Sequence, residues 1–528
     1  MFNKWTVFNA PTAPTSLKDK FSGPFQPDIM ILLTDGSVLV HNTGALDEND
    51  VSPAREWRRL TPDLTLPDPY GQGKWSDTIL MVNVRQYFAS GVLMDGRVFA
   101  IGGEDSVDPN PPHSTIHDIP LGEIFDPRTN KWSVIDKPKD FDFINGDAPS
   151  CMLSDGRILI GGATDSQPPN RRTALWSPLD PSLNPNGEEW MEAGLDASGQ
   201  STKSDQCAEE SWALLPDGSV LATAVFNNPQ AERYVPSLDR WFLTATPPSL
   251  AFDMLQGLDV NEIGPTILLP SGVAFAVGAT GTTGLFAYDH NHPKGPGKWK
   301  QGPSFPPNLQ STPINWPTLT ACDAPACLLP SGKVVCVGGT PEPGPNSDYA
   351  VFLEYDPNSS ATVIAPLDQQ PPLSNPATLT CRLWMLILPT GQLLCSQSDV
   401  PVLLYSPARD ERLAHPAWKP KITSLPATMQ GGQSYQIMGT QFNGLSQAAG
   451  YGDDGQMATN YPIVMITNDA NGASRYLHSY NFSTMAVATG NTVVSCTIDL
   501  PKGLPTGTWD LSVITNGIPS ISKQFQLQ

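Results

Sequence analysis

The sequence predicts an all-β protein in which a ring of seven four-stranded sheets precedes a smaller β-sandwich. The first observation behind this prediction is a hairpin signal that recurs seven times before residue 400. The second is the composition, because 54 Pro and 44 Gly residues among 528 disfavour long helices. Hydrophobic residues still make up 39% of the chain, which suffices for a large core and excludes a disordered protein.

Each repeat begins with an apolar strand, a turn that ends in Gly, and a second apolar strand. Gly supplies the positive φ that a tight hairpin requires, so each of these turns predicts a hairpin. Successive turns lie 54–62 residues apart, which leaves room for a four-stranded unit. The turns are Asp35-Gly36, Asp95-Gly96, Asp155-Gly156, Asp217-Gly218, Ser271-Gly272, Ser331-Gly332 and Thr390-Gly391.

Two more strands follow most hairpins, and the outer strand often carries a Trp, as at Trp132, Trp241 and Trp299. Seven repeats of four strands predict a seven-bladed β-propeller of the Kelch type. The seventh repeat lacks its Trp strand, whereas residues 3–8 (NKWTVF) carry that pattern at the other end of the chain. We therefore expect the N-terminal strand to complete the last blade of a propeller formed by residues 1–415.

The repeat stops at a short Pro-flanked segment, residues 416–420 (PAWKP). The rest of the chain contains about seven short strands, separated by turns such as Gly431-Gly432 and Asn516-Gly517. This pattern predicts a second domain, an immunoglobulin-like β-sandwich of residues 416–528.

The charge of the chain limits the partners that it can bind. With 52 acidic and 31 basic residues the net charge is −21, which argues against nucleic acid and against an anionic membrane surface. No segment stays apolar for the roughly 18 residues of a membrane-spanning helix. The first residues also lack the apolar stretch of a signal peptide. We expect a protein without a membrane span, cytoplasmic or secreted with its signal removed or by a non-classical route. The oligomeric state stays open.

The eight cysteines include no CxxC pair, so the sequence predicts neither a disulfide scaffold nor a zinc site. Most of them fall in strand-like runs, where Cys acts as a small buried hydrophobic residue. Cys327 and Cys336 would face each other if Ser331-Gly332 formed a two-residue turn. The sequence leaves open whether these two thiols are oxidised.

The inner strand of each blade lines the axis of a propeller, so residues at the start of these strands meet at one mouth. Counting eight residues back from the first residue of each turn selects one such position per blade. These ring positions are Pro27, Tyr87, Asp147, Glu209, Ile263, Asp323 and Arg382. The ring is rich in carboxylates, and we take its polar members as candidate catalytic residues, namely Tyr87, Asp147, Glu209, Asp323 and Arg382.

Further side chains flank the ring and are candidate ligand-binding residues. Asp28, Glu210 and Glu262 lie one residue from ring positions, and Trp75 and Trp316 lie in long loops where they would stack on sugar faces. Such carboxylates suit Ca²⁺ or Mn²⁺, the hydroxyl groups of a sugar, or a general acid and base pair. Polar residues of inner strands also serve a structural role, in which they bind neighbouring blades and water.

A propeller followed by a sandwich resembles galactose oxidase and the glyoxal oxidase-like proteins over essentially the whole chain. The resemblance is carried by residues 85–90 (RQYFAS) before 94–99 (MDGRVF), and by residues 516–520 (NGIPS). Residues 451–462 (YGDDGQMATNYP) resemble bacterial and fungal Kelch proteins of this group. The resemblance implies a copper site built from a Tyr cross-linked to a Cys, a Tyr-His pair and a His from a sandwich loop.

Only Tyr87 of these implied copper ligands is present at its position. Pro27 stands where the family has Cys, and Cys381-Arg382 stand where it has Tyr-His. His478 is the only candidate from the sandwich and is out of place in its loop. Because a guanidinium stays protonated and cannot bind Cu²⁺, the sequence disfavours copper.

Three kinds of function remain open. The first is a binding protein whose acidic mouth takes a small-molecule or glycan ligand, carbohydrate-like or cationic, with Ca²⁺ as an option. The second is an enzyme at the same mouth, either an alcohol or aldehyde oxidase with a displaced copper or a carboxylate-based hydrolase or lyase. The third is a scaffold that binds another protein through the flat face of the propeller.

Overall fold

The computed structural model describes most of the chain. The described segments are residues 3–8, 25–43, 55–104, 118–147, 149–162, 171–178, 181–250, 263–290, 292, 294–307, 318–339, 350–373, 380–397, 402–408, 412–451 and 457–528. Two candidate ligand-binding residues, Glu262 and Trp316, lie outside these segments. In the described part, the helices are 3-10 turns: η2 (Lys139–Phe141), η3 (Pro181–Leu183), η4 (Pro236–Leu238), η6 (Thr380–Arg382) and η8 (Pro416–Trp418).

The protein is all-β, and its first part consists of antiparallel sheets that follow one another along the chain. We number these sheets I to VII along the chain and give the strands of each sheet from the inner strand outward. Sheet I contains β2 (Pro27–Leu32), β3 (Val38–Asn42), β4 (Glu56–Thr61) and β5 (Lys74–Trp75), with β6 (Ile79–Leu80) on β4. Sheet II contains β7 (Ala89–Val92), β8 (Val98–Ile101), β9 (Gly122–Asp126) and β10 (Lys131–Val134). Sheet III contains β11 (Ser150–Met152), β12 (Ile158–Gly161), β13 (Thr173–Trp176) and β14 (Trp190–Ala193).

The remaining four sheets repeat this order with small additions. Sheet IV contains β15 (Ser211–Leu214), β16 (Val220–Thr223), β17 (Ala231–Val235) and β18 (Arg240–Leu243). Sheet V contains β19 (Thr266–Leu268), β20 (Ala274–Val277), β21 (Thr283–Ala287) and β22 (Lys298–Gln301). Sheet VI contains β23 (Pro325–Leu328), β24 (Val334–Gly338), β25 (Val351–Tyr355) and β26 (Ala365–Pro366), and β33 (Ala449–Tyr451) joins it from the C-terminal part. Sheet VII contains β27 (Leu383–Ile387), β28 (Leu393–Gln397), β29 (Val402–Ser406) and β1 (Lys4–Phe8).

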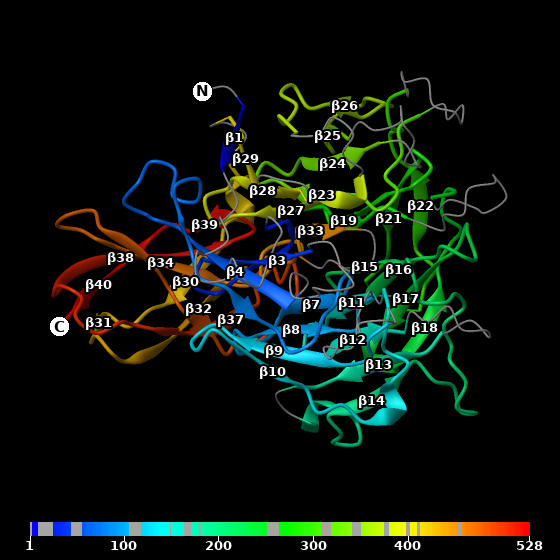
Figure 1. Cartoon of the computed structure of the whole chain (residues 1–528), viewed down its shortest axis with the longest axis horizontal. Helices are drawn as coiled ribbons and strands as arrows, with labels where there is room; N and C mark the ends of the chain where they lie inside the picture. The colour runs from blue at the N-terminus through cyan, green and yellow to red at the C-terminus, as the bar shows by residue number, and fades with distance from the viewer. Residues whose placement is uncertain are drawn as a thin grey trace, which may run out of the picture.

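Sheet VII joins the two ends of this region. Its outer strand is β1 from the N-terminus, which pairs antiparallel with β29 from Lys4 opposite Ser406 to Phe8 opposite Val402. On the inner side, the Ser396 hydroxyl of sheet VII donates to the Asp28 carbonyl of sheet I at 2.6 Å. Together the two contacts bring the last sheet beside the first one, so neighbouring sheets surround an axis (Figure 1).

The seven predicted hairpins all share one turn geometry. The glycine φ values lie between 74° at Gly391 and 90° at Gly156, as predicted for these positions. In the first turn, Leu33 N donates to Ser37 O at 2.7 Å and Gly36 N donates to Leu33 O at 2.9 Å, and the other six repeat this pattern. Each loop therefore has three residues, the last a Gly in the left-handed conformation.

This loop length corrects the predicted pairing of two cysteines. A three-residue loop places Cys336 opposite Ala326, and Cys327 opposite Val335, so the two cysteines are not direct partners across the hairpin. All eight cysteines are free thiols in the structure. The turn residues were assigned correctly, but the register was one residue off because the loop is one residue longer than assumed.

Tryptophan residues occupy the outer strands of most sheets. Trp132, Trp241 and Trp299 lie in β10, β18 and β22, as the repeat pattern predicts. Trp75 belongs to the same set, because it lies in β5, three strands out from the inner strand of sheet I. Its ring centroid lies 6.2 Å from that of Phe25. Trp75 therefore lies in an outer strand, where it packs near Phe25, and not in the loop that the sequence predicted.

The C-terminal part contains two more sheets, shown in orange and red in Figure 1. One sheet contains β30 (Lys421–Ser424), β32 (Ser434–Thr440), β37 (Val493–Asp499) and β36 (Ser479–Tyr480). The other contains β31 (Thr428–Met429), β40 (Lys523–Leu527), β38 (Gly507–Thr515), β34 (Ile463–Asn468) and β35 (Ser474–Leu477), with β39 (Ile518–Pro519) on β38. In this C-terminal unit the paired strands are antiparallel, apart from the parallel pair of β31 and β40.

The C-terminal unit packs against the hairpin turns of some of the sheets. Gly36 lies against the Tyr476 ring and Gly96 against Ser479. A Cβ built on Gly272, at the turn of sheet V, would meet no atom of the described residues within 4 Å, so the described part of the C-terminal unit leaves this turn uncovered. One buried hydrophobic cluster contains residues of sheet I, such as Ile31, and of the C-terminal unit, such as Ile463. The two parts therefore share a core.

No helix within the described segments has the length and hydrophobicity that a membrane crossing requires.

We expect Trp5→Ala in β1 to lower the free energy of unfolding by about 2–4 kcal/mol. The centroid of the Trp5 ring lies 5.2 Å from that of Phe352 in sheet VI and 4.9 Å from that of Tyr405. The indole N–H of Trp5 also donates to the Gln369 carbonyl at 2.8 Å. Urea unfolding of the variant, with Trp5→Phe as the control that keeps an aromatic ring, measures this loss. An unfolding midpoint equal to that of the wild type would contradict this role of β1.

Candidate functional site

Three of the predicted ring residues share an unusual backbone conformation. Tyr87, Glu209 and Asp323 have φ values of 46°, 62° and 40°, although none is Gly. Each residue lies two positions before the inner strand of its sheet, β7, β15 or β23. Left-handed backbone in non-Gly residues is uncommon and costs free energy, and it concentrates at functional sites. The eight-residue count therefore selects equivalent positions in three different sheets.

The polar ring residues are accessible from solvent. Tyr87, Asp147, Glu209 and Asp323 are half-buried, and Arg382 is exposed at the end of η6. In sheet III the positive φ falls on Gly146 at 65°, one residue before Asp147, so the bend there is shifted by one position. Side chains at this end of the strands can therefore meet a ligand from solution.

Electrostatic contacts bring sheets IV, VI and VII together at this end. Burial raises the pKa of the Cys322 thiol well above its usual range, and the Asp323 and Glu209 carboxylates raise it further. Burial also raises the pKa of Cys381 to about 12, with Asp323 adding to the effect and Arg382 opposing it. Asp323 thus acts on both thiols, Glu209 on Cys322 and Arg382 on Cys381, and the two thiols stay protonated at neutral pH.

Backbone contacts bring the segments of Tyr87 and Asp147 together on the other side. Gln86 and Glu104 form an isolated β-bridge, and Gly103 forms another with Gly146, which precedes Asp147. A Cβ at Gly103 would lie 2.7 Å from the Gln86 carbonyl, so Gly is required for this close approach. We call the site formed by Tyr87, Asp147, Glu209, Asp323 and Arg382 the mouth.

The other two ring positions contribute no polar group. Ile263 is buried and packs with Val225 and Leu250. Pro27 is buried at the start of β2. The next residue, Asp28, is 2% exposed, and its Oδ2 lies 2.9 Å from Nδ1 of the buried His41. Asp28 therefore lies in the interior, where it contacts His41, and not at the surface of the mouth.

Glu210 also points into the interior, in contrast to the prediction. Its Oε1 lies 2.7 Å from Nζ of Lys203, and its Oε2 accepts a hydrogen bond from the Trp212 indole at 2.9 Å. The same Lys203 Nζ lies 3.2 Å from Glu232 Oε1, and all three charged side chains are at most 1% exposed. Since Glu210 follows Glu209 directly, this buried network anchors the backbone on one side of the left-handed residue.

Burial and charge pairing shift the pKa values of Glu210, Lys203 and the neighbouring Asp205. Burial raises the pKa of Glu210 to about 8, although the ammonium group of Lys203 opposes the effect. Burial disfavours the charged form of Lys203, but Glu210 and Glu232 more than offset this and raise its pKa. Burial likewise raises the pKa of Asp205, whose Oδ2 accepts from the backbone N–H of Val225 at 2.9 Å.

Two buried basic residues, Lys203 and Arg85, were not predicted from the sequence. In sheet II the Arg85 guanidinium lies 3.1 Å from Glu123, and both side chains are fully buried. Glu123 also accepts from the backbone of Val82 at 2.7 Å, just as Glu232 accepts from Ser204 at 2.7 Å. The signal was a Glu followed two residues later by an aromatic residue and four later by Pro, at 123–127 and 232–236.

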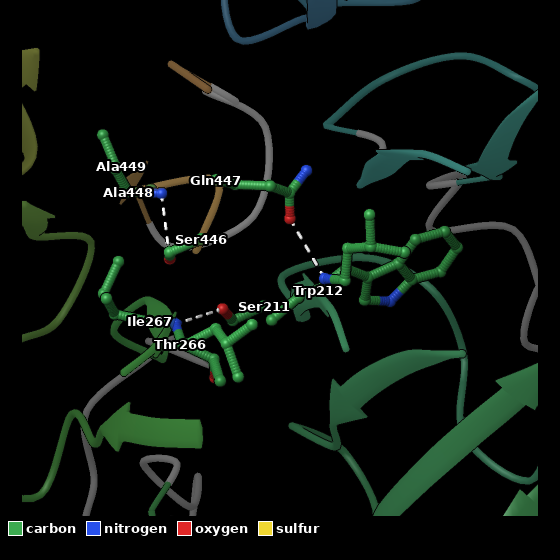
Figure 2. A pocket seen from close by; sticks show the side chains of 12 residues that line it. Ser211, Trp212, Thr266, Ile267, Ser446, Gln447, Ala448 and Ala449 are labelled. Carbon is green, nitrogen blue, oxygen red and sulfur yellow. Dashed lines mark hydrogen bonds between the residues drawn. The ribbon is translucent and has the colours of Figure 1, made fainter. Parts of the chain in front are cut away.

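A segment of the C-terminal unit occupies the axis of the ring. Residues 446–450 lie against the inner strands β15 and β19, and Figure 2 shows Gln447 facing Trp212. The Gln447 side-chain oxygen accepts from Leu214 N at 3.0 Å, and Leu328 N donates to the Ala448 carbonyl at 2.7 Å. Packing leaves a cavity of about 10 Å³ between these strands, the size of one water. We call residues 446–451 the axial segment.

The axial segment reaches the mouth at Tyr451. The Tyr451 hydroxyl donates to the Cys381 carbonyl at 2.9 Å, and its ring stacks on Trp384 at 5.4 Å. In the β23–β33 pair, Tyr451 lies opposite Pro325, two residues after Asp323. The C-terminal unit therefore supplies a wall next to two residues of the mouth, which the sequence pattern did not indicate.

His478 and Tyr87, the two side chains considered for a copper site, lie at opposite ends of one inner strand. His478 lies beside Gly96, at the turn of sheet II, whereas Tyr87 lies at the opposite end of the same inner strand. The His478 Nδ1 lies 3.2 Å from Asp499 Oδ2 within the C-terminal unit. Across the described residues, no three His, Cys, Asp or Glu side chains lie close enough together to hold a metal ion.

Comparison with known proteins supports the fold. The family model of the Kelch motif matches residues 87–139. A solved structure of a fungal alcohol oxidase of the AA5 family, in complex with copper, resembles the chain with a TM-score of 0.51 at 15% identity, over 100% of both chains. The Dos1 propeller covers 77% of this chain and 95% of its own at 12% identity, with a TM-score of 0.36. No curated protein matches the chain in sequence.

We expect the free energy of unfolding to fall as the pH rises from about 4.5 to about 8, because of Glu210. The unfolded chain loses this proton near 4.5 and the folded protein only near 8, so between them the folded state holds the extra proton. The slope from one such group is at most about 1.4 kcal/mol per pH unit. Urea unfolding at pH 5 and pH 8 measures it.

Glu210→Gln should remove this part of the pH dependence. Glu188→Gln, at an exposed position, is the matched control and should keep the slope of the wild type. An identical slope in the wild type and in Glu210→Gln would show that Glu210 titrates normally.

Proposed function

We propose that this chain, which has the galactose oxidase-like Kelch-propeller fold, is a binding protein whose mouth takes a carbohydrate-like or cationic ligand. The observation that carries the proposal is the convergence of Glu209 and Asp323. Both stand in left-handed backbone before inner strands of different sheets, and both carboxylates act on the Cys322 thiol. Fixed, half-buried carboxylates are strong acceptors for hydroxyl and ammonium groups.

The architecture behind this proposal is a closed ring. We infer that sheets I to VII are the seven blades of a propeller formed by residues 1–415, with β1 as the outer strand of the last blade. The two C-terminal sheets then form an immunoglobulin-like sandwich of residues 416–528, whose axial segment fills the ring from the turn side. In this arrangement the ring is closed at the turn side, and the mouth opens to solvent only at the other end.

The residues of the mouth define the chemistry of its ligand. Three carboxylates and one guanidinium give an acidic site, and the Tyr87 hydroxyl adds a hydrogen-bonding group. Amino sugars and other hydroxyl-rich cations match this pattern, because ammonium and hydroxyl groups both donate to carboxylates. Calcium also prefers oxygen ligands, so the same carboxylates are candidate ligands for Ca²⁺.

Oxidation through copper, the chemistry of the fungal structural neighbour, does not fit these residues. Arg382 and Pro27 occupy positions where the resemblance requires copper or radical ligands, and His478 lies near the turn of sheet II. A guanidinium carries donors and no acceptor, so it offers a metal cation no ligand atom. We therefore derive no oxidative step for this site.

We expect Asp323→Asn and Glu209→Gln to weaken binding of a cationic glucosamine oligomer at least tenfold, because each removes one negative charge from the mouth. Isothermal titration calorimetry with and without added Ca²⁺ measures this, and the neutral N-acetylglucosamine oligomer separates charge from hydroxyl recognition. Asp469→Asn, in the C-terminal unit, is the control and should bind like the wild type.

Each outcome of this experiment distinguishes between the functions considered. Equal affinities of the mouth variants and the wild type would sink the proposal and favour a protein-binding scaffold. Turnover of either oligomer that the variants lose, with folding retained, would instead show an enzyme at the same mouth.

A further inference from the structure

We propose that a second cavity, on the turn side of sheets III and IV, binds a neutral carbohydrate of one or two sugar units. The cavity has a volume of about 470 Å³, within the range of about 300–1,000 Å³ that small-molecule sites occupy. The turns at Asp155 and Asp217 form part of its wall, so it lies at the opposite ends of the inner strands from the mouth. Its polar lining consists of Ser154, Asp155, Arg157, Asp217, Ser237 and His290.

The charges of this lining are balanced in pairs. The Asp155 carboxylate lies 2.7 Å from the Arg157 guanidinium, and the Asp217 carboxylate lies 2.5 Å from that of Arg233. An ionised carboxylate accepts about four hydrogen bonds, so it still accepts from ligand hydroxyls after pairing with Arg. Each carboxylate therefore keeps about one acceptor position for a ligand hydroxyl, and the small net charge favours a neutral polyhydroxylated ligand over an ion.

The wall behind Asp217 is rigid before any ligand arrives. Asp217 Oδ1 accepts from the backbone and the hydroxyl of Ser219, at 3.0 and 2.6 Å. The Arg233 guanidinium lies 4.5 Å from the Tyr288 ring centroid, and the Tyr288 hydroxyl accepts from Asp217 N at 3.1 Å. The His290 ring in turn lies 4.6 Å from the Tyr288 ring. Such preorganised polar groups lose little entropy when they bind a ligand.

Apolar surface completes the match to a sugar. Pro216, Val235 and Pro236 line the same cavity as the charged pairs. A sugar ring has a C–H face that packs on such surface and hydroxyl groups at its edge for the polar residues. A lining that combines both is typical of sites that orient a small ligand by a few polar contacts.

The C-terminal unit borders this cavity without filling it. The Thr484 hydroxyl and the Met485 N–H donate to the Ser154 carbonyl at 2.6 and 2.9 Å, so the edge of the unit lies next to the cavity. In the neighbouring turn of sheet V, none of the described residues has an atom within 4 Å of a Cβ built on Gly272. The ligand would therefore enter from the uncovered side of sheets IV and V.

Binding of neutral sugars to the full chain tests this inference. An array of neutral mono- and disaccharides identifies a bound sugar, and isothermal titration calorimetry then measures its affinity. Ser237→Trp places a large side chain in the cavity from an exposed position and should weaken binding at least tenfold. Ser360→Trp, at an exposed position of sheet VI outside the cavity, is the matched control and should stay within twofold of the wild type.

Two further variants make the result decisive. His290→Ala should leave the fold intact, because His290 is exposed, and should measurably lower the affinity for the sugar. Asp323→Asn in the mouth should leave this affinity unchanged. Failure of every neutral sugar to bind, or binding that Ser237→Trp does not alter, would overturn the inference. If only Asp323→Asn abolished sugar binding, the sugar would bind at the mouth, and this result would likewise overturn the inference.

Discussion

The inner strand of every sheet in a ring has an edge without a neighbouring strand, and its backbone N–H and C=O groups face the axis. Buried backbone groups without a partner are costly, so a ring of this size needs something to satisfy them. Here the axial segment does so for two of the inner strands, through β33 on β23 and through Gln447 on Leu214 of β15. The C-terminal unit is therefore part of the hydrophobic core of the ring as well as a domain in sequence.

The same axial segment shapes the mouth. Tyr451 stacks on Trp384 of sheet VII and donates to Cys381, next to Arg382. In sheet IV, the buried network of Lys203, Glu210 and Glu232 holds the backbone beside Glu209. The positions of two mouth residues thus depend on buried interactions that never touch a ligand, which is how strained backbone is maintained at a site.

The acidic residues occur in three kinds of surroundings: the interior, the mouth and the cavity at the turns. Those in the interior are matched with bases, as Asp28 with His41 and Glu123 with Arg85, because an unpaired buried charge is costly. Those at the mouth are half-buried and form an acidic cluster around two neutral thiols. The cavity at the turns follows a third arrangement, in which each carboxylate is paired with Arg and faces a partly apolar surface. The carboxylates at the two ends of the strands therefore lie in different electrostatic surroundings.

Local patterns in the sequence predicted the hairpins, the outer-strand Trp residues and the ring positions Tyr87, Glu209 and Asp323, because each depends on spacing and on the conformational range of a few neighbouring residues. The pairing of Cys327 and Cys336 was wrong because one extra loop residue shifts the register of a strand. Asp28 and Glu210 were misplaced because their partners, His41 and Lys203, become neighbours only through packing. The axial segment was beyond reach for the same reason, since it contacts strands more than a hundred residues away in the chain. Contacts of that kind arise from the burial of backbone edges and charges, which no local pattern encodes.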